Sequence, residues 1–162
     1  MSESLIEYTI IIEGEPIPKA RHRTAHKDKN GNALPYVIFY DTQKEKKKAY
    51  REAAFQYLIK TGTAIFIIEG DPVSITCSFY MRRPKSHYGT GKNSEILKQN
   101  APYYCTKKKD IDNLDKHVFD CLNGLCFKDD KQIVESHSKK IYSENPRTEI
   151  RIRSLGNDKG FK

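Results

Sequence analysis

The chain of 162 residues fits one domain with its own core, and its 37% of hydrophobic residues, recurring in short runs, exclude disorder throughout. No apolar stretch approaches the roughly 20 residues that span a bilayer, and acids stand at the N-terminus where a signal peptide carries basic residues. We therefore expect a cytoplasmic protein with no membrane segment. The formal net charge of +8 favours a polyanion such as nucleic acid as the partner.

The first part of the chain predicts two strands. Residues 5–12 form a β-branched strand, and residues 36–40 form a second one. Between them lie a basic run at residues 19–23 and a polar loop at residues 26–33, turned by Asn30-Gly31.

A long helix is predicted after the second strand. Thr42 and Glu45 are spaced as a capping box, which opens a helix that runs to about Lys60. We expect its buried side to contain Ala49, Ala53 and Tyr57.

Three further strands are predicted in the second part of the chain. Residues 73–81 form the first of them, and a long mobile loop at residues 82–100 could wrap DNA. Residues 133–142 and 147–153 form the other two, and we expect them to make a hairpin across residues 143–146.

A second helix has clear end signals. It begins at Asp112 or Asn113, both good N-caps, and ends at Asn123-Gly124, where glycine supplies a left-handed C-cap. At roughly 100° per residue, one side of the helix is apolar and another is polar. The apolar side carries Leu114, Val118, Cys121 and Leu122, and the polar side carries Asp112, Lys116 and Asp120.

These elements predict an α+β fold. We expect a single domain over residues 1–155, with a mixed β-sheet of about four to five strands packed against two main helices on one face. Residues 156–162 are expected to be a flexible tail. The four cysteines include no C-x-x-C pair and are expected to be reduced and packed. The alternative is a zinc site made of Cys105, His117, Cys121 and Cys126.

The charges are unevenly distributed. Residues 110–130 contain six aspartates and two lysines, a net charge of −4, so the rest of the chain carries +12. An acidic island in a basic protein suggests that basic surfaces hold phosphates while carboxylates hold a cation against one of them. This charge plan is typical of a nuclease.

Two acidic segments predict a metal site. On extended backbone, Asp110 and Asp112 share one face while Ile111 turns into the core. The intervening helix can fold the Asp129-Asp130 turn back toward them, so that a third carboxylate completes a site for Mg²⁺, which prefers oxygen ligands. Each piece alone also fits a helix cap or an ordinary turn.

The combined pattern resembles the RusA family of Holliday junction resolvases, whose signature reads D-x-D-N-L-x-K, then D-x-L-N-G, then D-D-x-Q. This sequence carries the three parts at residues 110–116, 120–124 and 129–132. A second similarity to the family's N-terminal segment involves Gly14, Pro16, Pro18, Lys19, Arg21 and Arg23. The resemblance spans roughly residues 8–152. One departure is Lys109, where many relatives have proline, and we expect it to change the stiffness of the loop but not the reaction.

The resemblance implies roles for the acidic residues. Asp110, Asp112 and Asp130 are the essential metal-binding carboxylates, and Lys116 is an essential base that is not a ligand. The implied cofactor is Mg²⁺, with Mn²⁺ as a substitute. The secondary candidates are Asp129, as a further metal ligand, and Asp120, which either pairs with Lys116 or has a structural role near the helix cap.

The resemblance also implies the substrate and the assembly. The family acts on four-way DNA junctions as a homodimer, because a two-fold protein presents two sites to two symmetry-related strands and cuts them by paired symmetric nicks. Some family members are associated with phages, which makes a phage origin plausible.

Basic residues in loops near the site are the candidates for DNA contacts. They are Lys19, Arg21, Arg23, Arg82, Arg83, Lys85, Lys107, Lys108 and Lys109. The aromatic pairs at residues 79–80 and 103–104 could stack on unpaired bases, but aromatics beside strands are core residues more often than not.

Two other functions remain open. A non-catalytic nucleic-acid-binding module would use the aspartates as caps and turns and would bind DNA without cutting it. A related Mg²⁺ nuclease could act on flaps, forks or plain duplex, because a carboxylate cluster defines phosphodiester hydrolysis and not DNA shape.

Overall fold

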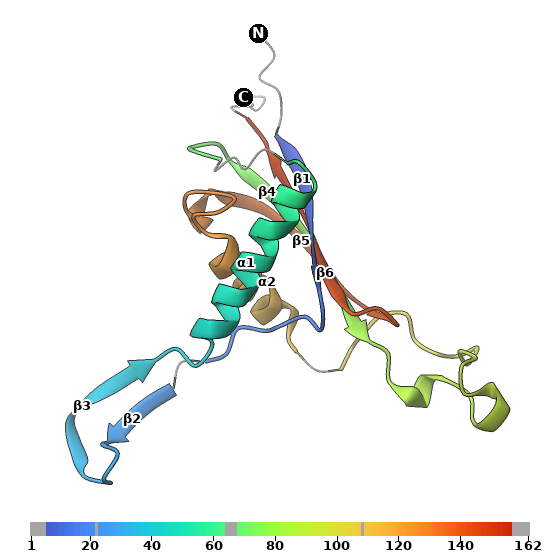
Figure 1. The fold of residues 1–162 in the computed structure, drawn as a ribbon, viewed down its shortest axis with the longest axis horizontal. Coiled ribbons are helices and arrows are strands. Elements are labelled where there is room, and N and C mark those ends of the chain that lie inside the picture. The colour runs from blue at the N-terminus through green and yellow to red at the C-terminus, as the bar shows by residue number, and fades with distance from the viewer. Residues whose placement is uncertain (1–5, 22, 64–67, 108, 157–162) are drawn as a thin grey trace.

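The computed structural model describes residues 6–21, 23–63, 68–107 and 109–156. Figure 1 shows a sheet covered on one side by two helices, with two projections leaving this body. The elements in chain order are β1 (Glu7–Glu13), β2 (Arg23–Lys27), β3 (Ala33–Tyr40), α1 (Lys44–Lys60), β4 (Val73–Arg82), the 3₁₀ turns η1 (Lys85–His87) and η2 (Gly91–Asn93), α2 (Ile111–Leu122), η3 (Asp130–Gln132), β5 (Ile133–Ser143) and β6 (Arg147–Ser154).

Four strands form one mixed sheet in the order β1-β6-β4-β5. β6 pairs antiparallel with both β1 and β4, whereas β5 pairs parallel with β4. The predicted α+β class, with a mixed sheet and two main helices, is confirmed. β2 and β3 form a separate two-stranded sheet. β2 was not expected, because its sequence lies in the basic run and the polar loop.

The predicted hairpin between the last two strands is wrong. β5 and β6 lie on opposite edges of β4, and residues 144–146 pass across the end of that strand. β4 is buried over Val73 to Ile75 and again over Cys77 to Phe79, so a partner on each edge suits it. The alternation predicted for β6 is confirmed, because Thr148, Ile150 and Ile152 are all buried.

α1 turns a different side to the core from the predicted one. Its buried residues are Tyr50, Ala54 and Leu58, each one position after the expected Ala49, Ala53 and Tyr57. The capping box at Thr42 does not form. Instead, the Asp41 carboxylate accepts the Gln43 N–H at 2.8 Å and the Lys47 ammonium at 2.8 Å. The missed cap signal lies one residue earlier in the sequence.

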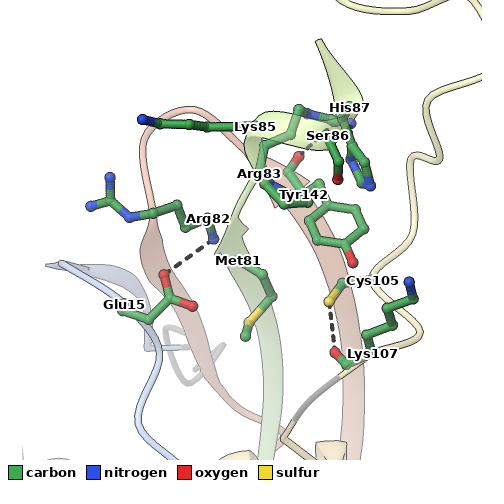
Figure 2. Close-up of a pocket in the computed structure, with 11 residues that line it drawn as sticks. Glu15, Met81, Arg82, Arg83, Lys85, Ser86, His87, Cys105, Lys107 and Tyr142 are labelled. Carbon is green, nitrogen blue, oxygen red and sulfur yellow. Dashed lines mark hydrogen bonds between the residues drawn. The ribbon is translucent and has the colours of Figure 1, made fainter.

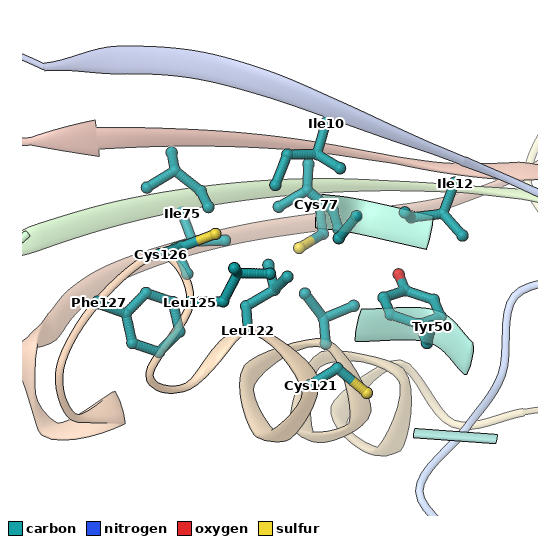
Figure 3. Packing of buried hydrophobic residues seen from close by; sticks show 14 of the residues in the cluster. Ile10, Ile12, Tyr50, Ile75, Cys77, Cys121, Leu122, Leu125, Cys126 and Phe127 are labelled. Atoms are coloured by element: carbon teal, nitrogen blue, oxygen red, sulfur yellow. The ribbon is translucent and has the colours of Figure 1, made fainter. Parts of the chain in front are cut away.

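α2 matches its prediction closely. The predicted apolar side, Leu114, Val118, Cys121 and Leu122, is buried together with His117. Gly124 follows the helix with φ +68, the left-handed conformation that its end signal predicted. The core lies between the helices and the sheet, where Leu122, Cys126 and Phe127 face Ile10 and Ile75 (Figure 3).

Two projections flank the body (Figure 1). The hairpin arm, residues 23–40, consists of β2 and β3, and the Asp28 carboxylate accepts the N–H groups of Asn30 and Asn32 at its turn. The β4–α2 excursion, residues 83–104, contains η1, η2 and a bridge between Tyr88 and Leu97. The predicted long loop is therefore partly built of short turns. Its predicted mobility stays a prediction.

The described chain reaches Gly156, so nearly all of the expected tail lies outside the described residues. None of the helices in the described ranges is both long enough and apolar enough to span a bilayer.

Candidate functional site

The start of α2 carries the first two candidate carboxylates. Asp110 is the N-cap on extended backbone, and Asp112 lies in the first helical turn. Both are exposed. Ile111 is the first residue of the helix and is 38% exposed, so its predicted direction into the core is wrong. The backbone is extended at Asp110 but helical from Ile111 onward, so side chains do not alternate between two faces from Asp110 to Asp112.

Three contacts fix the entry to this helix. The Lys140 ammonium from β5 donates to the Lys109 carbonyl at 2.8 Å, and the Lys109 ammonium donates to the Pro16 carbonyl at 2.6 Å. The Lys19 N–H donates to the Asn113 carbonyl at 2.7 Å. Lys109 has φ 54, a left-handed conformation that proline cannot adopt. The backbone before Asp110 therefore differs from one that holds proline at this position.

Lys116 pairs with Asp112. The ammonium lies 3.0 Å from the carboxylate, one helical turn away, and both side chains are solvent-exposed. The hydrogen bond from Lys116 lowers the pKa of Asp112 below its usual value. Of the two alternatives for Asp120, the pair with Lys116 is wrong. Asp120 faces the other way and binds Lys19 at 2.9 Å and Lys47 at 3.4 Å.

Asp115 is a further carboxylate of α2, outside the predicted metal site. The Ser138 hydroxyl from β5 donates to it at 2.6 Å, which ties the middle of α2 to the sheet. Burial raises the pKa of Asp115, and the nearby charge of Asp112 raises it further. Its place in the sequence, three residues after Asp112 and between the polar and apolar sides of the helix, could have indicated a half-buried carboxylate.

Hydrogen bonds of the Gln132 side chain fix the Asp129-Asp130 turn. The Gln132 side chain accepts the Asp129 N–H at 3.0 Å and donates to the carbonyls of Ile68 and Asp71 at 2.8 and 3.0 Å. Asp129 caps η3, and its hydrogen bond from the Lys131 N–H lowers the pKa of its carboxyl. Asp130 is exposed. The D-D-x-Q pattern thus builds a fixed turn that presents Asp130 to solvent.

A single chain does not bring Asp130 to the start of α2. Asp130 precedes Ile133 at one end of β5, whereas Lys109 is bound to Lys140 seven residues along that strand. At about 3.3 Å per residue, Ile133 and Lys140 are roughly 23 Å apart along β5. Among the described residues, no three His, Cys, Asp or Glu side chains come close enough to hold a metal ion. The role of Asp130 as a ligand stays a prediction.

Two carboxylates remain together at the start of α2. Asp110 and Asp112 offer exposed oxygen donors without histidine or thiolate, the donor type that Mg²⁺ prefers. Two protein carboxylates leave room for waters or substrate oxygens around such an ion. The donor set therefore fits a hard divalent cation that a further group completes.

The candidate DNA-binding residues divide into two groups. Three are bound within the protein: Lys19 to Asp120, Lys109 to Pro16, and Arg83 to the Pro102 carbonyl at 2.9 Å. Lys108 lies outside the described residues. The candidates whose side chains are exposed are Arg21, Arg23, Arg82, Lys85 and Lys107.

Two aromatic residues next to the site are exposed. Tyr103 and Tyr104 are 57% and 62% exposed, which leaves them free for base stacking, whereas Phe79 is a core residue. Their backbone is fixed to β5, because the Tyr142 N–H donates to the Tyr103 carbonyl at 2.9 Å and Tyr104 bridges to Ile141. The tyrosine pair, Tyr103 and Tyr104, is thus held rigidly at the surface.

The four cysteines are buried and unbridged. Burial raises the pKa of Cys121 to about 12 and that of Cys126 to about 11, so both thiols are protonated at neutral pH. The Cys121 sulfur lies 3.6 Å from His117 Nε2 on the buried side of α2. Burial also lowers the pKa of His117 to about 4.

Two comparisons with known proteins match most of this chain. A family model described as Endodeoxyribonuclease RusA matches residues 13–153, which include every candidate site residue named above. An uncharacterized protein of Bacillus subtilis (strain 168), YqaN, is 36% identical over 152 residues, covering 93% of this chain and 96% of that relative.

Proposed function

Because this chain belongs to the RusA family of endodeoxyribonucleases, we propose that it resolves four-way DNA junctions by divalent-metal-dependent cleavage. The observation that carries this proposal is the pair of exposed carboxylates, Asp110 and Asp112, at the start of α2 beside a basic surface. Such a surface holds phosphates while oxygen ligands hold a cation against one of them. The expected cytoplasmic location accords with a DNA substrate.

The proposed metal ligands are Asp110 and Asp112, with Mg²⁺ as the ion and Mn²⁺ as a substitute. Bound there, Mg²⁺ lowers the pKa of a water and neutralises charge on the phosphate. The hydrogen bond from Lys116 lowers the pKa of Asp112, so it favours the ionised form of a proposed metal ligand. The Lys116 ammonium, one helical turn from Asp112, would stabilise negative charge on a phosphate held at this site.

We propose that a homodimer supplies the third carboxylate. Asp130 of the partner subunit can reach a site that Asp130 of the same chain, which precedes the far end of β5, cannot. β5 is an edge strand of the sheet, and Val134 near its start is 60% exposed. Residues 103–105 cover only the far end of this edge.

Antiparallel pairing of two β5 edges fits this requirement. A two-fold axis near Ser136 sets Ile133 of the partner subunit opposite Lys139. The partner subunit's Asp130 then lies close to Lys140, which contacts the loop before Asp110. Two equivalent composite sites form, as paired nicks require.

The test is cleavage of a synthetic mobile four-way junction beside matched fork and duplex DNA, with Mg²⁺ or EDTA. Symmetric, metal-dependent nicks confined to the junction support the proposal. Equal cleavage of forks or duplex would instead make the protein a less selective nuclease. Junction binding without cleavage would favour the non-catalytic module.

The composite site has its own test. Asp112→Asn and Asp130→Asn homodimers should both be inactive. Mixing them and allowing subunits to exchange should restore nicking, because each mixed dimer contains one complete site. Asp112→Asn mixed with an Asp110→Asn chain is the matched control and should stay inactive, since no site then keeps both residues. If the first mixture also stays inactive although exchange is complete, the dimer proposal is wrong.

A further inference from the structure

A cavity of about 580 Å³ lies at the base of the β4–α2 excursion, close to the proposed site. Figure 2 shows it between the end of β4, the first turn of the excursion and the segment that leads to α2. Its volume is in the range of pockets that hold small organic ligands. The cavity was not visible in the sequence, because its walls come from four separate segments.

The interior of the cavity is mostly apolar and well fixed. Met81, Pro84, Cys105 and Tyr142 line it. The Tyr142 ring packs edge-on against His87 at 4.8 Å between ring centroids, and the Arg83 guanidinium lies 5.5 Å from its centre. Cys105 is held by its own N–H, which donates to the Lys140 carbonyl at 3.0 Å. The cavity therefore offers a preorganised apolar surface against which a flat apolar group can pack.

The rim of the cavity is positively charged. Arg82, Lys85 and Lys107 line it, and their side chains are exposed without an ion pair to any described residue. The pKa of His87 is lowered by burial and then by the cations Arg83, Lys107 and Lys98, which agrees with a positive potential. A ligand that suits both parts has a flat apolar body and an anionic group.

The cavity adjoins the proposed cleavage site. Lys107 is three residues before Asp110, so their Cα atoms are at most about 11 Å apart. Glu15, another lining residue, lies 3.5 Å from the Lys109 ammonium, which precedes Asp110 directly. A strand whose phosphate lies at Asp110 and Asp112 would pass the mouth of the cavity with its neighbouring nucleotides.

We propose that this cavity receives an unstacked nucleotide from the branch point of the junction, next to the cleaved phosphate. The base packs against Met81 and Tyr142, and its phosphate is held by Arg82, Lys85 and Lys107. A branch point is suited to this, because its bases lose part of their stacking and cost less to extrude than bases within a duplex. This proposal rests on the proposed function and adds to it a residue set that senses branched structure.

The experiment uses Asp112→Asn chains, which should hold the junction without cutting it, and junctions with 2-aminopurine stepped across the branch point. Ser86→Phe fills the mouth of the cavity from an exposed position, so it should leave the core intact. Ser94→Phe is the matched control, because Ser94 is exposed on the same excursion and does not line the cavity. Circular dichroism and thermal unfolding check that both variants fold.

With Asp112→Asn alone, binding should change the fluorescence of 2-aminopurine at one position beside the cleaved phosphate. Ser86→Phe should abolish this change and weaken junction binding roughly fivefold or more, whereas Ser94→Phe should do neither. No change at any position, or a change that survives Ser86→Phe, would overturn the proposal. Saturable binding of free nucleoside monophosphates that Ser86→Phe blocks, with no change in the junction, would overturn it in favour of a free-nucleotide site.

The wild-type chain separates this proposal from the proposed function. If it cleaves junctions while 2-aminopurine reports nothing, only the cavity proposal fails. If it cleaves nothing while the fluorescence change appears and depends on Ser86, the proposed nuclease function fails and the cavity stands as a site for unpaired DNA.

Discussion

Lys116 donates to Asp112 at 3.0 Å across one turn of α2, and this contact ties a cation to one of the two proposed metal ligands. The hydrogen bond lowers the pKa of Asp112, so the carboxylate stays ionised at a lower pH than an isolated aspartate. Two roles of Lys116 are thereby joined. Lys116 favours the ionised form of Asp112, and it places a positive charge near the phosphate.

Lys116→Met should reduce junction cleavage and move the acid limb of the pH–rate profile upward. Without Lys116, the pKa of Asp112 rises toward its usual value, so protonation at a given acidic pH becomes more extensive. Lys116→Arg should keep most of the acid limb in place. The measurement is single-turnover cleavage between pH 3 and pH 6, a window that includes the usual pKa of an aspartate. A lower rate with an unshifted limb would show that Lys116 does not act through Asp112.

The buried His117 should make the fold sensitive to acid. Burial lowers its pKa to about 4 in the folded protein, so the unfolded chain, with its pKa near 6.5, binds more protons between these values. Stability should fall as pH decreases from about 6.5 to 4, by about 3 kcal/mol at most. Urea unfolding at several pH values measures this. His117→Met should flatten the dependence, and a matching change at the exposed His137 should not.

Asp115 should act as a link between α2 and β5. Ser138→Ala removes the hydroxyl that donates to it at 2.6 Å and should cost about 1–2 kcal/mol of unfolding free energy. The pKa of Asp115 is raised by burial, so its contribution to stability is greatest at low pH and is lost as pH rises. The cost of Ser138→Ala should therefore be larger at pH 7 than at pH 4, where protonated Asp115 needs less support. An equal cost at both pH values would contradict this.

The exposed tyrosine pair should contribute to junction binding by stacking on bases. Tyr104→Ala should weaken binding by about 1–3 kcal/mol, whereas Tyr104→Phe should retain most of the affinity, because a phenyl ring still stacks. Ile59→Ala, an exposed apolar position on α1, is the control for loss of surface area. Electrophoretic mobility shifts with the Asp112→Asn chain give the affinities. A loss with Tyr104→Phe equal to that with alanine would point to the hydroxyl group.

The basic residues should separate into DNA contacts and internal ties. Lys85→Ala removes an exposed cation and should reduce the slope of log affinity against log salt by about 0.9. Lys19→Ala breaks an ion pair with Asp120 and should lower the unfolding free energy while leaving this slope nearly unchanged. Fluorescence anisotropy over a salt series, with urea unfolding beside it, measures both. The division would be wrong if Lys19→Ala changed the slope and Lys85→Ala did not.

Local patterns predicted most of the secondary structure. The alternation of β6 and the apolar stripe of α2 were both sufficient, because Ile150, Ile152, Leu114 and Val118 repeat at the periods of a strand and a helix. The buried side of α1 was missed by one position. The helix is rich in alanine and lysine, and its apolar residues stand in adjacent pairs. Adjacent residues differ too little in hydrophobicity to show which of them packs against β1.

Arrangement in space was less predictable than local structure. Nothing in residues 133–153 shows that β4 separates the two last strands, because that order depends on a partner from another part of the chain. The position of Asp130 was unpredictable for the same reason, because it depends on contacts with another part of the chain. Its turn is fixed by Gln132 to the backbone of Ile68 and Asp71, and no local pattern reports that contact.

The sheet order also constrains how the protein is made. β6 lies between β1 and β4 and pairs with both, Glu7 with Arg153 and Cys77 with Ile150. Because β6 follows all the other strands in the sequence, a chain emerging from the ribosome holds β1 and β4 with open edges until β6 appears. Stalled synthesis before residue 147 would thus leave two apolar strands without their shared partner, a state that chaperones must shield from aggregation.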